Sequence, residues 1–198
     1  MTSEAPRGAR GVLSHFWTPM TAVGSHDASR PNAQICVSVF GASIVPDQPR
    51  LFVNLSKTNY TTELVEAAGT LSVTVLSSEQ AGLLEPLGLR SGRDGQKLRS
   101  GRDGQKLHDV ACELDAHGDP WFPGGVGRVA CEVIETYDLG DALTFLCAVR
   151  EQVTLSAAEP LTWALARTVV GDEFLQRWAE KSEHEQAAAR AAMHWRPA

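Results

Sequence analysis

NAQICVSVFGASIVPDQPRLFVNLSKTNYTT, residues 32–62, is the stretch that decides the fold, because it contains two strand patterns, a turn and the start of a helix. Residues 35–40 place apolar side chains at alternate positions, which is the pattern of a half-buried strand. Residues 51–55 repeat the pattern after an interruption by two prolines. Residues 63–68 then have a helix-like composition, and Gly69 is a typical helix end.

A polar run at residues 56–62 separates the second strand from this helix. It offers hydroxyl, amide, phenol and ammonium groups directly before a helix N-terminus, where free backbone N–H groups and the helix dipole favour an anion. A phosphate monoester would suit the run, with Lys57 as the point charge and with donors from Ser56, Asn59, Thr61 and Thr62. The alternative is that Thr61 or Thr62 is only an N-cap in a polar turn, since caps occur on most helices and phosphate sites on few.

Several short motifs follow one another in a recognisable order and spacing. They are Asn32-Ala33, Ser43 with Pro46 and Pro49, the strand 51–55, Ser56-Lys57 with Thr61-Thr62, Gly69, the strand 73–77, residues 91–97 and the strand at Cys131. Together they resemble the flavin reductase-like FMN-binding split-barrel family, over roughly residues 12–155. The resemblance implies a mainly β fold, a six-stranded antiparallel split β-barrel with a few peripheral helices, which usually forms a homodimer with FMN between or near the subunits.

The resemblance also implies where the cofactor is held. Residues along the first strand would lie against the isoalloxazine ring, mostly through backbone groups, and the polar run would take the phosphate. The implied binding residues are Asn32, Ala33, Gln34, Ile35, Cys36, Ser56, Lys57, Asn59, Thr61 and Thr62. Hydride would pass through flavin N5, so the protein orients the flavin and tunes its potential, and no side chain is named as catalytic.

The activity implied is that of an FMN-containing, NAD(P)H-dependent flavin reductase, which passes electrons to free flavin, a partner monooxygenase or another acceptor. One corner departs from the family, because such reductases often read Gly-Asp-His where this chain has Gly140-Asp141-Ala142. That histidine is associated with the nicotinamide nucleotide, and Ala142 has no ring to donate or stack. The departure favours an alternative, an FMN-dependent electron carrier or flavin-holding protein reduced by a partner protein. A weaker third possibility is an FMN-dependent oxidase or a specialised biosynthetic redox enzyme on the same barrel.

Composition places the chain of 198 residues among ordinary globular proteins, with 43% hydrophobic residues and a net charge of −6. The acidic balance argues against a nucleic-acid-binding protein, and no apolar run reaches the roughly 18 residues of a membrane span. The first ten residues lack the apolar segment of a secretion signal. The four cysteines form no C-x-x-C pair, which predicts a reduced, cytoplasmic protein without a metal site.

We expect three segments: a loose tail at residues 1–11, the FMN-binding split-barrel domain at residues 12–158 and a helical extension at residues 159–198. Within the domain, the sequence RSGRDGQKL of residues 90–98 is repeated unchanged at residues 99–107 and forms a basic loop in an acidic protein. The repeat is either a solvated loop, which its glycines favour, or a clamp for a phosphate-bearing nucleotide.

The rest of the chain yields further elements and two candidate polar pairs. Strands are expected at residues 20–24, 71–75, 126–136, 142–149 and 153–155, and helices at residues 81–87, 161–169 and 172–195. His26-Asp27 is a candidate catalytic pair, and His117-x-Asp119 is a candidate pair of metal ligands. For His26-Asp27 the alternative is a plain turn, which is the more frequent one in loops. Against a metal site at His117-x-Asp119 stands the lack of a third ligand pattern nearby.

Overall fold

A computed structural model describes residues 16, 19–28, 30–93 and 106–194. Its helices and strands, in chain order, are β1 (Thr21–His26), β2 (Pro31–Cys36), β3 (Val39–Gly41), β4 (Arg50–Ser56), α1 (Tyr60–Ala68), β5 (Thr70–Val75), η2 (Ser78–Leu83), η3 (Glu85–Leu89), β6 (Glu113–Leu114), β7 (Pro120–Trp121), β8 (Gly127–Asp138), β9 (Ala142–Thr154), α3 (Trp163–Val169) and α4 (Asp172–Ala192). The tail expected at residues 1–11 lies outside the described residues, and the domain boundary at residue 158 stays a prediction. No helix in the described ranges is long and apolar enough to cross a membrane.

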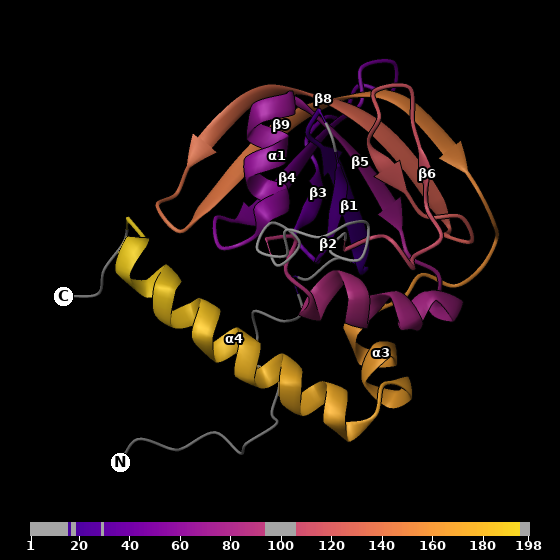
Figure 1. Ribbon diagram of the computed structural model, residues 1–198. Helices are drawn as coiled ribbons and strands as arrows, with labels where there is room; N and C mark the ends of the chain where they lie inside the picture. Colours follow the sequence, from indigo (N-terminus) through magenta and orange to yellow (C-terminus); the bar gives the residue numbers. More distant parts are fainter. Residues whose placement is uncertain (1–15, 17–18, 29, 94–105, 195–198) are drawn as a thin grey trace, which may run out of the picture.

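One curled antiparallel sheet makes up most of the molecule (Figure 1). Its seven strands lie in the order β2-β1-β5-β8-β9-β4-β3, and β6 and β7 form a separate ribbon of two strands. The expected mainly β barrel is therefore confirmed, with seven strands in the main sheet in place of six.

The strand expected at residues 35–40 is divided, and the division explains part of the difference in strand count. β2 ends at Cys36 and pairs with β1, whereas β3 begins at Val39 and pairs with β4. β2 and β3 are the two edge strands of the sheet, so the chain passes directly from one edge to the other at residues 37–38. This passage brings the edges together and closes the barrel on one side.

Two long strands, β8 and β9, form the hairpin that gives the sheet its curvature. Their register shifts between Ala130 and Cys131 and again between Val133 and Glu135, and such bulges bend and twist a strand pair. The strand expected at residues 153–155 is the end of β9, which runs without a break from Ala142 to Thr154.

The core has two parts. Inside the barrel, Val23, Val53, Val65, Leu71 and Phe145 are among the buried residues of one cluster. A second cluster lies under η2, η3 and α3 and includes Met20, Leu76, Leu84, Leu87, Phe122 and Leu161. Each fully buried side chain of this size stabilises the fold by roughly 1.5–3 kcal/mol, so both clusters are substantial.

The C-terminal helices close the other end of the molecule. α3 begins at Trp163, where the Thr162 side chain caps it by accepting from the Leu165 N–H. In Figure 1 α4 runs below the barrel, from α3 toward the turn between β8 and β9. No described residue of α4 is fully buried, so the helix lies on the surface, but Phe174 near its start packs against the second core cluster.

Candidate functional site

The helix α1 begins at Tyr60, three residues before the expected start at Glu63. Its N-cap is Asn59, with extended backbone angles of φ −93° and ψ 135°, and the Asn59 side chain makes no capping hydrogen bond. The interpretation of Thr61 or Thr62 as the N-cap is therefore wrong, because both lie in the first turn and both are buried. The N–H groups of this turn lack a side-chain cap at Asn59.

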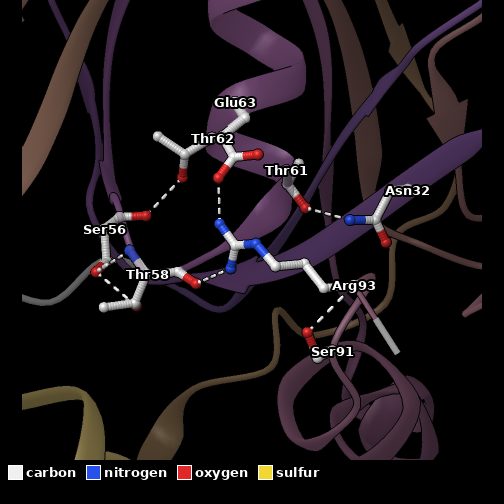
Figure 2. A network of polar contacts seen from close by, with 8 residues as sticks. All are labelled: Asn32, Ser56, Thr58, Thr61, Thr62, Glu63, Ser91 and Arg93. Atoms are coloured by element: carbon white, nitrogen blue, oxygen red, sulfur yellow. Dashed lines mark hydrogen bonds and ion pairs between the residues drawn. The ribbon is translucent and has the colours of Figure 1, made fainter. Parts of the chain in front are cut away.

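Ser56 and Thr62 belong to a local network that shapes the corner between β4 and α1 (Figure 2). The Thr62 hydroxyl donates to the Ser56 carbonyl over 2.6 Å, and the Ser56 and Thr58 hydroxyls lie 2.8 Å apart. The Thr58 N–H also donates to the Ser56 hydroxyl. These hydrogen bonds are all internal to the corner and fix its shape.

Lys57 faces the turn between β8 and β9. Its ammonium lies 2.6 Å from the Asp138 carboxylate, and its backbone N–H donates to the Asp141 carbonyl. The hydrogen bond from Lys57 lowers the pKa of Asp138, and a second from the Gly140 N–H adds to the effect. Both side chains are well accessible to solvent, at 37% and 56% exposed, so the pair contributes little to stability. Lys57 therefore lies beside the predicted phosphate corner, and its ammonium is paired with Asp138.

Asn32 and Gln34 on β2 carry buried oxygen atoms that have no partner among the described residues. The Asn32 amide nitrogen donates to the Thr61 hydroxyl over 3.1 Å, which leaves Asn32 Oδ1 unused (Figure 2). An unsatisfied buried polar group costs about 1–3 kcal/mol. The two residues line small cavities that Asn59 shares, so a ligand with hydrogen-bond donors would satisfy both oxygens.

The other three predicted residues of β2 divide between packing and the cavity. Ala33 is buried in the second core cluster, and Ile35 lines the cavity beside Gln34. The Cys36 thiol lies in the barrel core, where burial raises its pKa to about 11. A raised pKa and burial in the core are typical of a structural cysteine that packs as a small apolar group.

Arg93 is a site residue that the sequence reasoning did not assign. Its guanidinium donates to the Thr58 carbonyl over 2.6 Å and pairs with Glu63, directly over the start of α1 (Figure 2). Gly92 allows this approach, because a Cβ there would lie 2.6 Å from Asn32 Nδ2.

Lys106, from the second copy of the repeat, donates to the Leu87 carbonyl and lines the same cavity as Thr61. The signal available in the sequence was the basic repeat itself.

The two candidate polar pairs are rearranged by the fold. His26 does not pair with Asp27: its Nδ1 lies 2.7 Å from the buried Asp119, while Asp27 accepts from the Tyr60 hydroxyl. Burial raises the pKa of Asp119, against the hydrogen bond from His26 that lowers it. Asp119, in the loop before β7, therefore meets His26 at the end of β1. No metal-binding group of three or more His, Cys, Asp or Glu residues occurs in the described part of the chain.

Comparison with known proteins places this chain in one family. The family model described as "Flavin reductase like domain" matches residues 13–169. The chain belongs to the flavin reductase-like family. A curated relative, the high molecular weight rubredoxin of Moorella thermoacetica, is 29% identical over 137 residues, which cover 68% of this chain and 55% of the relative. The chain thus spans only about half the length of that relative.

Solved structures of flavin reductase-like proteins share the fold at low sequence identity. An FMN-binding protein from Thermus thermophilus has a TM-score of 0.63 at 22% identity, covering 81% of this chain and 86% of that one. The NADH:FAD oxidoreductase SgcE6 of Streptomyces globisporus has a TM-score of 0.62 at 22% identity, covering 75% and 82%. Nitrilotriacetate monooxygenase component B from Mycobacterium thermoresistibile has a TM-score of 0.61 at 21% identity, covering 75% of each chain.

Proposed function

We propose that this flavin reductase-like protein binds FMN and acts as an NAD(P)H-dependent flavin reductase. The observation that carries the proposal is the pair of unpartnered, buried oxygens of Asn32 and Gln34, which open onto cavities at the N-terminus of α1. A flavin mononucleotide supplies what this corner lacks: an anion for the helix N-terminus, and hydroxyl and ring N–H donors for the oxygens. Family membership agrees with this choice of ligand.

Each group of residues has a distinct role in the proposed complex. The first turn of α1, with Asn59 and Thr61, binds the phosphate, and the cations Lys57, Arg93 and Lys106 surround it. Asn32 and Gln34 accept hydrogen bonds from the ribityl chain or the ring, and the backbone from Ala33 to Cys36 lies along the ring. Ser56 and Thr62 hold the corner in shape. When bound, the flavin supplies the hydride chemistry, and the protein orients it and keeps water away.

A second candidate function follows from Ala142. This residue is buried at the corner where a histidine would be expected, and it offers no group to a nicotinamide nucleotide. An FMN-dependent electron carrier or flavin-holding protein, reduced by another protein, needs no such group. We therefore keep this function as the alternative to direct reduction by NADH or NADPH.

Assembly and partners follow the same proposal. We infer a cytoplasmic homodimer that passes electrons to a partner monooxygenase or to free flavin. The similarity to a protein named as a monooxygenase component supports this kind of partner.

The decisive test mixes FMN-loaded protein with NADH and with NADPH in a stopped-flow instrument and follows the flavin absorbance. Rapid bleaching with either nucleotide supports a reductase. If neither nucleotide bleaches a flavin that the protein demonstrably binds, the reductase is ruled out and the electron carrier remains. A protein that stays colourless after FMN is added and excess removed would end both proposals.

The phosphate corner has its own mutational prediction. Lys57→Ala combined with Thr61→Ala should raise the Kd for FMN at least about ten-fold more than the Kd for riboflavin, because only FMN carries the phosphate. Calorimetric titration of both flavins measures the ratio. Thr154→Ala, at the far end of β9, is the control and should change neither Kd. An equal loss for both flavins would place the phosphate elsewhere.

A further inference from the structure

The C-terminal helix α4 lies outside the matched domain, which ends at residue 169, yet it borders the candidate site. Three of its partly buried residues, Trp178, Lys181 and Glu185, are spaced three and four residues apart and so share one helix face. All three line the cavity that Gln34 of β2 also lines. The helix therefore presents a definite face to the strand that is proposed to carry the flavin.

Three cavities follow one another between β2 and this face of α4. The first, of about 50 Å³, lies between Thr61 and Lys181, and the second, of about 100 Å³, shares Gln34 and Lys181 with it. A third, of about 280 Å³, shares Ile35 and Trp178 with the second. Because the second cavity shares residues with each of the other two, the three are neighbours, and residues of β2 and α4 line all of them. We call this set of three cavities the channel.

The side chains that line the channel change from cationic to polar to aromatic along its length, in the same order as the phosphate, ribityl chain and ring of a flavin nucleotide. Its first end has the N-terminus of α1 together with the cations Lys106 and Lys181. The buried oxygens of Asn32 and Gln34 follow. The far end is apolar and aromatic, lined by residues that include Val37, Trp163 and Trp178. This order matches phosphate, ribityl chain and ring.

Trp178 is held in a defined position at the aromatic end. Its ring centroid lies 5.1 Å from that of Trp163 and 5.5 Å from that of Phe174. Its six-membered ring also packs on Gly88 of η3, where an added Cβ would lie 2.4 Å from the indole. Aromatic pairs at such distances restrict the indole, so it can act as a fixed surface for a flat ligand.

We propose that α4 completes the flavin site, with Trp178 covering the isoalloxazine ring and Lys181 facing the phosphate end. This inference rests on the proposed FMN binding and adds two specificity-determining residues from outside the matched domain. None of the three cavities reaches the roughly 300 Å³ of a typical small-molecule site, so bound flavin joins them by displacing the shared side chains of Ile35 and Glu185, while Trp178 keeps its place. On binding, Lys181 leaves its ion pair with Glu185 and pairs with the flavin phosphate instead.

The test titrates FMN and riboflavin into wild type, Trp178→Phe, Trp178→Ala and Lys181→Met, and follows flavin fluorescence as well as Kd. An indole stacked on a flavin quenches its emission by electron transfer, whereas a phenyl ring does not. Trp178→Phe should therefore brighten bound FMN several-fold with little change in Kd. Trp178→Ala should weaken both flavins. Lys181→Met should weaken FMN about ten-fold and riboflavin much less.

Trp121→Phe, on β7 and in contact with Arg128, is the matched control and should behave as wild type. Thermal melts followed by circular dichroism establish that each variant is folded. If wild type binds FMN but the Trp178 and Lys181 variants match it in Kd and emission, the inference is overturned while the proposed function stands. Tighter FMN binding in the variants would also overturn it, since α4 would then compete with the flavin. If wild type binds no FMN, both fail together.

Discussion

Gly24 shows how closely single residues are fitted in this barrel. It lies in the middle of β1 beneath the β6–β7 ribbon, and an added Cβ would lie 2.1 Å from the Pro120 carbonyl oxygen and 2.8 Å from Ser72 Oγ. The Ser72 hydroxyl donates to the same carbonyl, and this hydrogen bond opposes a shift of the Pro120 backbone away from Gly24. Only a residue without a side chain fits between the sheet and the ribbon.

Gly24→Ala should therefore lower the free energy of unfolding by about 1–3 kcal/mol or more, because a methyl group is forced into a packed site. Urea denaturation measures the change. Gly41→Ala on β3 is the matched control, since an added Cβ meets nothing within 4 Å there, and it should stay within about 0.5 kcal/mol. Equal stability of the two variants would contradict the packing argument.

Asp119 should make the free energy of unfolding depend on pH. Burial raises its pKa in the folded protein, so the native state holds the proton more tightly than the unfolded chain does. Its contribution to stability is therefore greatest below the ordinary aspartate pKa of about 3.9 and is lost as the pH rises through the raised value.

Asp119→Asn removes this titration. From pH 4 upward, wild type should lose stability relative to the variant, and the difference should level off once the pH exceeds the raised pKa. Urea unfolding of both proteins at a series of pH values measures the difference, in which the titrating groups remote from Asp119 and its partner His26 cancel. A constant difference across the series would show that the pKa of Asp119 is the same in both states.

At the scale of the element, α4 is held at its far end by the turn between β8 and β9. Gly140 has φ +93°, and an added Cβ would lie 2.3 Å from the Ala192 carbonyl oxygen and 2.7 Å from the His194 nitrogen. The His194 N–H donates to the Leu139 carbonyl over 3.2 Å. This glycine therefore serves both the left-handed turn and the docking of the helix.

Gly140→Ala should release the end of α4 as well as straining the turn, at a cost of about 1–2 kcal/mol for the backbone alone. Hydrogen exchange of the amides near residues 185–194 should become faster, while exchange in β1 and β5 stays slow. Gly82→Ala, where an added Cβ meets nothing within 4 Å, is the control for the substitution itself. Unchanged protection of the helix end would show that the turn does not hold it.

At the scale of the whole molecule, FMN binding should raise the thermal stability of the protein. A ligand that binds only the folded state adds about 2.7 kcal/mol at a concentration one hundred times its Kd. FMN at that excess should raise the Tm by several degrees, and inorganic phosphate at the same concentration should not. Differential scanning fluorimetry with an extrinsic dye, or calorimetry, makes the measurement. An unchanged Tm with FMN would contradict binding to the folded protein.

Local patterns in the sequence foretold most of the secondary structure. Alternation of apolar residues identified the strands at residues 51–55 and 71–75. Gly69 correctly predicted the end of α1, where it takes the left-handed φ of 70°. The predictions failed where tertiary pairing chose between local options. The apolar alternation of residues 35–40 continues through Val37, but pairing with opposite edges of the sheet divides the strand.

The sequence by itself determined the fold class, the family and the polar corner at residues 56–62, because period, turn chemistry and motif spacing are local properties. Only the tertiary structure decided which groups meet there. It placed His26 against Asp119 and Lys57 against Asp138, brought Arg93 over α1 and put residues of α4 beside a cavity that β2 also lines. Such contacts join residues tens of positions apart, and they depend on how the sheet curls, which no local pattern encodes.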